Sequence, residues 1–131
     1  MIDLRLALQQ TFVIPEPGGV FRLVVPDLEY LARQYLNDST DSARSDFMRD
    51  SGLGQERRVR GLRGMLVGWL GNAEHRWMWD YKSLARELAS LGFVDVRRLA
   101  FGDCDGPMFQ AVEDPGRWRK CLGIECKRPI A

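Results

Sequence analysis

The chain has 131 residues, of which 45% are hydrophobic and 28% are charged, and 19 basic against 18 acidic residues leave a net charge of +1. This length predicts a single domain over residues 1–131, and the balanced charge gives no field to attract nucleic acid or an anionic membrane. No apolar run is long enough to span a bilayer, and charges interrupt the N-terminus where a signal peptide would be apolar. We therefore expect a cytoplasmic protein without membrane association.

The first predicted elements are a helix and a strand. Apolar residues at helical spacing predict a helix over residues 2–12, which ends at "IPEPGG" because prolines and glycines do not continue a helix. Residues 20–25, "VFRLVV", form a nearly continuous apolar run that is typical of a strand covered on both faces. Arg22 is the only charged residue in that run.

Several helices are predicted to follow this strand. Asp27 is a favourable N-cap residue for the next helix. A short helix is expected over residues 41–50. The apolar spacing over residues 55–70 predicts a longer helix, whose three interior glycines lower its helix propensity.

The last third of the chain contains the clearest helix and two strands. Asp80 is placed to cap a helix that Gly92 ends, as glycine commonly does just after a helix. The patterns then predict strands over residues 93–101 and 121–127, joined by a turn and a loop or irregular helix. The fold class is therefore α/β, with a small three-stranded sheet.

Cysteine and histidine are few. Three cysteines, Cys104, Cys121 and Cys126, argue against a disulfide framework, and the single histidine, His75, argues against a closed zinc site. Cys121 and Cys126 are predicted to point to opposite faces of one strand and so cannot share a metal. No metal site is expected.

Three separated segments of the chain resemble a known family. The segments "PGGVFRLVVPDLEYLARQY", "EHRWMWDYKSLARELASLGFVDVRRLAFGD" and "GIECKRP" are similar to the C-terminal, substrate-side half of class I S-adenosylmethionine-dependent methyltransferases. In that half, a "PGG" turn leads into the fifth strand, helices follow, and an antiparallel seventh strand lies between the fifth and sixth. The resemblance implies a truncated Rossmann-like fold with a mixed sheet in the order five, seven, six, and a helical lid over about residues 37–79.

The cofactor-binding half of that family has no counterpart in this sequence. It would supply a glycine-rich loop after a strand and a carboxylate for the ribose hydroxyls, as in dinucleotide sites. The paired glycines here, Gly18 and Gly19, precede a strand instead, which is typical of a turn. We assign no cofactor-binding residue and expect no cofactor for this chain alone; S-adenosylmethionine would require a complementary half.

The resemblance places the acceptor substrate beyond the first strand, under the lid. Candidate substrate-binding residues are Asp27, His75, Trp77, Trp79 and Tyr81. Each has a structural alternative: Asp27 as a helix cap, His75 as a residue that orders its loop rather than a general base, and the aromatic residues as core or interface anchors. No catalytic residue is assigned.

The first strand also predicts a contact with another chain. With the first four family strands absent, residues 20–25 would present an open apolar edge, and such edges pair with other polypeptides. Val20, Arg22 and Val24 are therefore predicted at an interface, in a homodimer or with a complementary chain. Two functions remain open: an acceptor-binding methyltransferase-like half that is inactive alone, with a small-molecule or protein acceptor, or a non-catalytic homodimeric interaction module.

Overall fold

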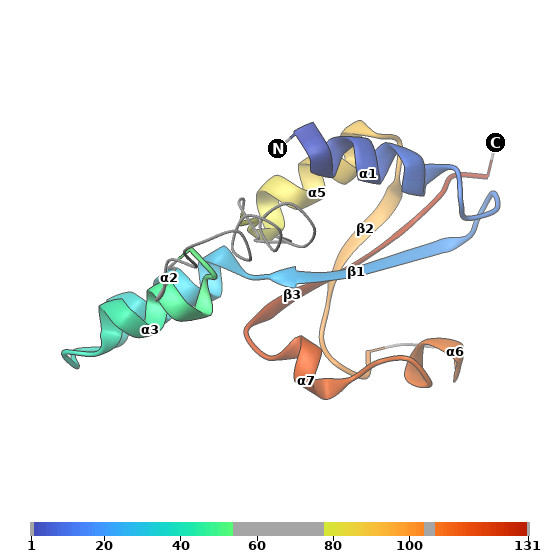
Figure 1. Ribbon diagram of the computed structural model, residues 1–131. Helices are drawn as coiled ribbons and strands as arrows, with labels where there is room; N and C mark the ends of the chain where they lie inside the picture. Colours follow the sequence, from blue (N-terminus) through green and yellow to red (C-terminus); the bar gives the residue numbers. More distant parts are fainter. Residues whose placement is uncertain (1, 54–77, 104–106, 131) are drawn as a thin grey trace, which may run out of the picture.

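The computed structural model describes residues 2–53, 78–103 and 107–130. A small three-stranded sheet carries helices on both faces (Figure 1). The strands are β1 (Val20–Pro26), β2 (Val94–Leu99) and β3 (Cys121–Lys127). The predicted α/β class is confirmed at this level.

The last strand of the chain is the central one. The order is β1-β3-β2, and β3 pairs antiparallel with both neighbours; Leu23 lies opposite Ile124 in one ladder, and Arg97 lies opposite Glu125 in the other. β1 and β2 run in the same direction but are not adjacent, so both ladders of the described sheet are antiparallel. The expectation of a mixed sheet is therefore wrong for these three strands, because β3 lies between the two that run in the same direction.

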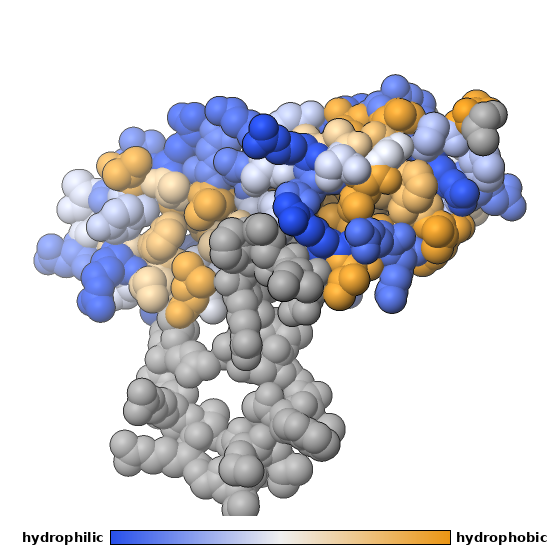
Figure 2. All heavy atoms as spheres, turned by 90° about the horizontal axis from the view of Figure 1, so that it is seen from above, coloured by the Kyte–Doolittle hydropathy of each residue, from blue (hydrophilic) through white to orange (hydrophobic). Residues whose placement is uncertain are grey.

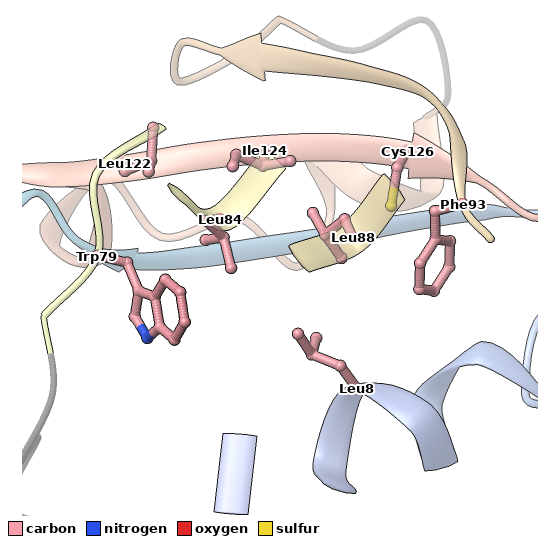
Figure 3. Close-up of a cluster of buried hydrophobic side chains, with 8 residues drawn as sticks. All are labelled: Leu8, Trp79, Leu84, Leu88, Phe93, Leu122, Ile124 and Cys126. Carbon is pink, nitrogen blue, oxygen red and sulfur yellow. The ribbon is translucent and has the colours of Figure 1, made fainter. Parts of the chain in front are cut away.

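Two helices cover one face of the sheet. These are α1 (Ile2–Phe12) and α5 (Tyr81–Ser90), which lie on the same side in Figure 1. Their side chains meet those of β3 in a buried cluster, drawn in Figure 3: Leu8, Trp79, Leu84, Leu88, Phe93, Leu122, Ile124 and Cys126. Phe93 lies between two other rings, edge-on to Phe12 at 4.9 Å and stacked on Phe21 at 5.6 Å between centroids.

The boundaries of α5 follow from local chemistry. The Asp80 carboxylate accepts the Ser83 N–H over 2.8 Å, and the Ser83 hydroxyl faces the Asp80 backbone N–H, which together make a capping box. Gly92 ends the helix with φ +98°, a left-handed conformation that favours glycine. A Cβ there would also come within 3.3 Å of the Phe12 ring, so Gly92 additionally allows α1 to pack closely.

The opposite face carries two single-turn helices, α6 (Pro107–Gln110) and α7 (Pro115–Trp118). The Trp118 ring lies directly against the backbone of Gly123 in β3, where an added Cβ would be only 2.2 Å from the ring. The expected loop or irregular helix thus holds an aromatic cover over the sheet.

Two further helices extend from the carboxyl end of β1. They are α2 (Leu28–Asn37) and α3 (Ala43–Asp50), which lie together at one end of the molecule in Figure 1. The predicted lid begins at about residue 37, so α3 lies in its first part and α2 precedes it. The predicted helix over residues 55–70 lies outside the described residues.

Candidate functional site

Asp27 stands at the carboxyl end of β1 and caps α2. One carboxylate oxygen accepts the N–H groups of Glu29 and Tyr30 over 3.0 and 3.2 Å, and the other accepts from the Arg98 guanidinium over 3.1 Å. The residue is only 7% exposed. Its capping contacts and its ion pair account for its position, and a contact with an acceptor remains a prediction.

Two of the predicted aromatic site residues lie beside Asp27. Trp79 is 6% exposed and belongs to the buried cluster; its carbonyl accepts the Leu28 N–H over 3.0 Å, so its backbone runs parallel to the end of β1. The Tyr81 hydroxyl donates to the Val96 carbonyl over 3.3 Å, and the Arg98 guanidinium lies 5.5 Å from the centre of its ring. Trp79 thus lies beside Asp27, and Arg98, which was not among the predicted site residues, connects Asp27 with Tyr81.

The other two predicted substrate-binding residues, His75 and Trp77, lie outside the described residues. The substrate roles of all five therefore stay predictions.

A hollow of about 280 Å³ lies between α2 and α3. Its apolar lining comes from Leu31, Tyr35, Ala43 and Phe47. At its rim Lys120 donates to Asp50, which ties the start of β3 to α3. This hollow lies where the resemblance places the acceptor, beyond the carboxyl end of β1.

Apolar side chains are also exposed on the outer surface at both ends of the molecule. Figure 2 shows hydrophobic side chains over the end of the molecule that carries α2 and α3 and over the end that carries α1. Leu36 of α2 is 79% exposed, and a separation of five residues turns it away from the buried Leu31 around the helix.

A larger hollow, of about 550 Å³, lies on the face of the sheet that carries α6 and α7. Val24, Pro26 and Leu99 of the sheet line it, and α6 and α7 contribute Phe109 and Trp118. It combines an apolar surface with charged residues at its borders, which is typical of a small-molecule or side-chain pocket.

Arg22 lies beside this second hollow, at the centre of an ionic network. Its guanidinium donates to Glu125 over 2.6 Å, to Glu113 over 3.0 Å and to the Asp103 carbonyl over 2.9 Å. It also lies 4.3 Å from the centre of the Phe109 ring. The side chain is only 9% exposed, so the residue predicted at an interface directs its charge into its own chain.

Glu125 connects this network to β2. Its second carboxylate oxygen accepts from Arg97 over 2.9 Å, so one buried carboxylate joins arginines from both outer strands. None of these partners of Glu125 was predicted from the sequence. The available signal was a pair of opposite charges: Arg22 is the only charged residue of β1, and Glu125 is the only acidic residue of β3.

The outer edge of β1 forms the second part of the candidate site. At one end of the β1–β3 ladder Arg128 N–H donates to Gly19, and at the other Asp27 N–H donates to Lys120. Successive residues of a strand direct their backbone groups to alternate sides, so odd-numbered residues of β1 face β3. The N–H and C=O groups of Val20 and Val24 therefore point to the other side, where no strand of the described part of the chain pairs with β1.

The carboxyl end of that edge has a described neighbour. Trp79 forms a parallel bridge with Asp27 there, next to Pro26, which has no N–H. Val20 and Val24 are 37% and 36% exposed and lie on the same face as Arg22. The predicted interface residues are thus edge residues, and their contact with another chain remains a prediction.

The glycine pair before β1 does not fit a cofactor-binding role. A Cβ on Gly19 would approach the Glu16 carbonyl oxygen to 2.8 Å, and one on Gly18 would meet Ile130 at 3.3 Å. The chain itself fills the space beside both glycines, so they form a tight turn and not a cradle for S-adenosylmethionine. Nor do the described residues group three histidine, cysteine, aspartate or glutamate side chains in a way that could hold a metal ion.

Comparison with known proteins adds no relative. No family model matches the chain, and neither a curated protein nor a solved structure matches it significantly. Among the helices that the structure describes, none has both the length and the apolar character needed to cross a membrane.

Proposed function

We propose that this chain is the acceptor-binding half of a methyltransferase-like protein, without an S-adenosylmethionine site of its own and inactive alone. The observation that carries the proposal is the position of β3, the last strand, antiparallel between β1 and β2. The resemblance of the sequence implies this arrangement for strands five, seven and six. The tight packing of Gly18 and Gly19 supports the absence of a cofactor site.

The hollow between α2 and α3 is the proposed acceptor site. It lies beyond the carboxyl end of β1, and its surface is mainly polar, with two ion pairs among the residues that line it. The chain would bind a small molecule or a protruding protein side chain there and orient its nucleophile, and such positioning supplies much of the acceleration in group transfer. Free Cys121 and Cys126 agree with a reducing, cytoplasmic location.

Calorimetry with S-adenosylmethionine tests the cofactor part of this proposal. We expect no binding heat from the purified chain, and micromolar affinity would contradict the absence of a site.

A fragment titration tests the acceptor part. Phenols, amines and carboxylic acids would be added to the isotopically labelled chain, with shift changes expected at Gln34, Asp38 and Arg49. Gln34→Trp should abolish these changes by filling the rim, whereas the control Arg33→Trp, which does not line the hollow, should leave them. Shift changes that persist in Gln34→Trp would remove the acceptor site from this hollow.

The edge of β1, which no strand of the described residues pairs with, favours a second candidate function, a non-catalytic homodimeric interaction module. Exposed apolar edge strands pair with other chains unless something covers them. Light scattering during size-exclusion chromatography tests this candidate: we expect a dimer at micromolar concentration, and a clean monomer would eliminate it. With a net charge of +1, binding to nucleic acid is not part of either proposal.

A further inference from the structure

We propose that two copies of this chain join through β1 in one antiparallel register, which places Val20 opposite Val24 of the second copy. The pairing would continue the three-stranded sheet into a six-stranded one across a two-fold axis. This inference rests on the homodimeric candidate function and specifies its interface.

The backbone of β1 restricts the register. Only the even-numbered residues of β1 direct their N–H and C=O groups to the open edge. A shift by one residue would place them opposite odd-numbered residues of the second copy, whose backbone groups point to β3, so no ladder would form. The backbone N–H and C=O groups of Val20 and Val24 both point to this edge. A two-fold axis midway between the two residues places Val20 of each copy opposite Val24 of the other, so that these two residues can exchange backbone hydrogen bonds.

Features at both ends of the strand limit how far the pairing can extend. At the carboxyl end, Pro26 lacks an N–H, and Trp79 already lies beside Asp27. At the amino end, the Gly19 N–H bonds back to the Glu16 carbonyl over 2.7 Å, and Gly18 has φ +79°, so the chain turns away. A shift by two residues would place Val20 opposite Pro26, or Val24 opposite Gly18, and would lose ladder bonds in either case.

The side chains also complement themselves in this register. Directly opposed residues share a face, so Val20 would cover Val24 of the second copy on the face that carries the larger hollow. Both are about one-third exposed in the single chain. On the other face Phe21 would lie opposite Leu23, two residues at the border of the buried cluster.

The two-fold axis passes beside Arg22, where two positive charges would come together. Like charges directly opposite one another normally destabilise a ladder. Here Glu125 and Glu113 of the same chain hold the guanidinium at 2.6 and 3.0 Å, on the face of the sheet that α6 and α7 cover. The charge of each Arg22 is therefore neutralised within its own chain. This explains how two copies can pair through β1 although Arg22, the only charged residue of that strand, would lie opposite itself.

Disulfide cross-linking tests the register. In a Val20→Cys/Val24→Cys chain, with Cys104 and Cys121 replaced by serine, opposed residues would have Cα atoms about 5.5 Å apart, which suits a disulfide. Residue 20 of one copy would be about 14 Å from residue 20 of the other, so neither single-cysteine variant can form the bridge. Under mild oxidation we expect about tenfold more cross-linked dimer from the double variant than from either single variant.

Amide hydrogen exchange on the unmodified chain gives a second test that does not depend on the variants folding. The Val20 and Val24 amides should be protected at high protein concentration and should exchange faster on dilution, while the Phe21 and Leu23 amides, which face β3, stay protected throughout. A dimer whose Val20 and Val24 amides exchange freely, or whose single variants cross-link as well as the double one, would overturn the register and leave the module proposal intact. A monomer would overturn both.

Discussion

Arg22, which was predicted at a contact with another chain, forms a buried ion pair with Glu125 of its own chain. Arg22 is the only charged residue of β1 and Glu125 the only acidic residue of β3, and the two strands bring these charges to 2.6 Å on the side of the sheet that α6 and α7 cover. Burying a charge costs free energy unless a partner compensates it, so each residue depends on the other.

Glu125→Gln should destabilise the protein by about 3 kcal/mol, the low end for a broken buried pair, because Arg22 keeps Glu113. Urea unfolding followed by circular dichroism measures this change. The control Glu29→Gln breaks the solvent-exposed pair with Arg33 and should have a much smaller effect. Equal effects of the two substitutions would show that the network around Arg22 does not stabilise the fold.

Cys126 should be chemically inert in the folded protein. Burial, together with the neighbouring Glu125 charge, raises the pKa of its thiol to about 12. At pH 8 iodoacetamide should therefore leave Cys126 unmodified until urea unfolds the chain, while the less buried Cys121 reacts sooner. Peptide mass spectrometry measures both.

The raised pKa of the Cys126 thiol also predicts how the stability of the fold changes with pH. The stabilisation from keeping the thiol neutral is complete below its unfolded pKa of about 8.5 and is lost as the pH rises towards 12. Rapid alkylation of Cys126 in the native protein at pH 8 would contradict its burial.

At the scale of elements, the packing of α7 on β3 depends on a glycine. Trp118 lies so close to Gly123 that a Cβ would overlap its ring at 2.2 Å, and the Leu99 carbonyl lies 3.1 Å away on the other strand. No local pattern in "CLGIECK" indicates this contact, because the tryptophan approaches from outside the strand.

Gly123→Ala should cost about 1–3 kcal/mol, since the ring or the strand must move to admit the methyl group. Thermal unfolding measures the loss. In a Trp118→Leu background the same substitution should cost less, because the side chain that it displaces has been removed. Additive losses in the double variant would show that Trp118 does not set the requirement for glycine.

Most elements could be predicted because their signals are local. The caps at Asp27 and Asp80 and the stop at Gly92 lie within a few residues of the helix ends that they define. The candidate site was less predictable: Asp27, Trp79 and Tyr81 were selected, but Arg98, which contacts both Asp27 and Tyr81, was not. Its contact with Asp27 joins residues 71 positions apart, and a sequence pattern carries no record of such a pairing.

For the molecule as a whole, the open edge of β1 predicts that stability depends on concentration. If two copies share a sheet, binding favours the folded state, and the melting temperature should rise from low to high micromolar concentration. Val24→Lys should abolish that rise, because a lysine on an edge strand opposes pairing. The control Leu36→Lys changes a residue of α2 that is 79% exposed and should preserve it. A wild-type melting temperature that does not change with concentration would contradict the dimer.

Within the described part of the chain, the sequence by itself determined where most helices and strands lie and that β1 is an apolar strand, because spacing, caps and turn residues act over a few positions. Only the tertiary structure decided that β3 is central, that Glu125 neutralises Arg22 and that Trp118 requires Gly123. These features join residues far apart in the chain, Arg22 and Glu125 by 103 positions. They also determine which side of β1 is left open, because the pairing with β3 directs the backbone groups of Val20 and Val24 away from it.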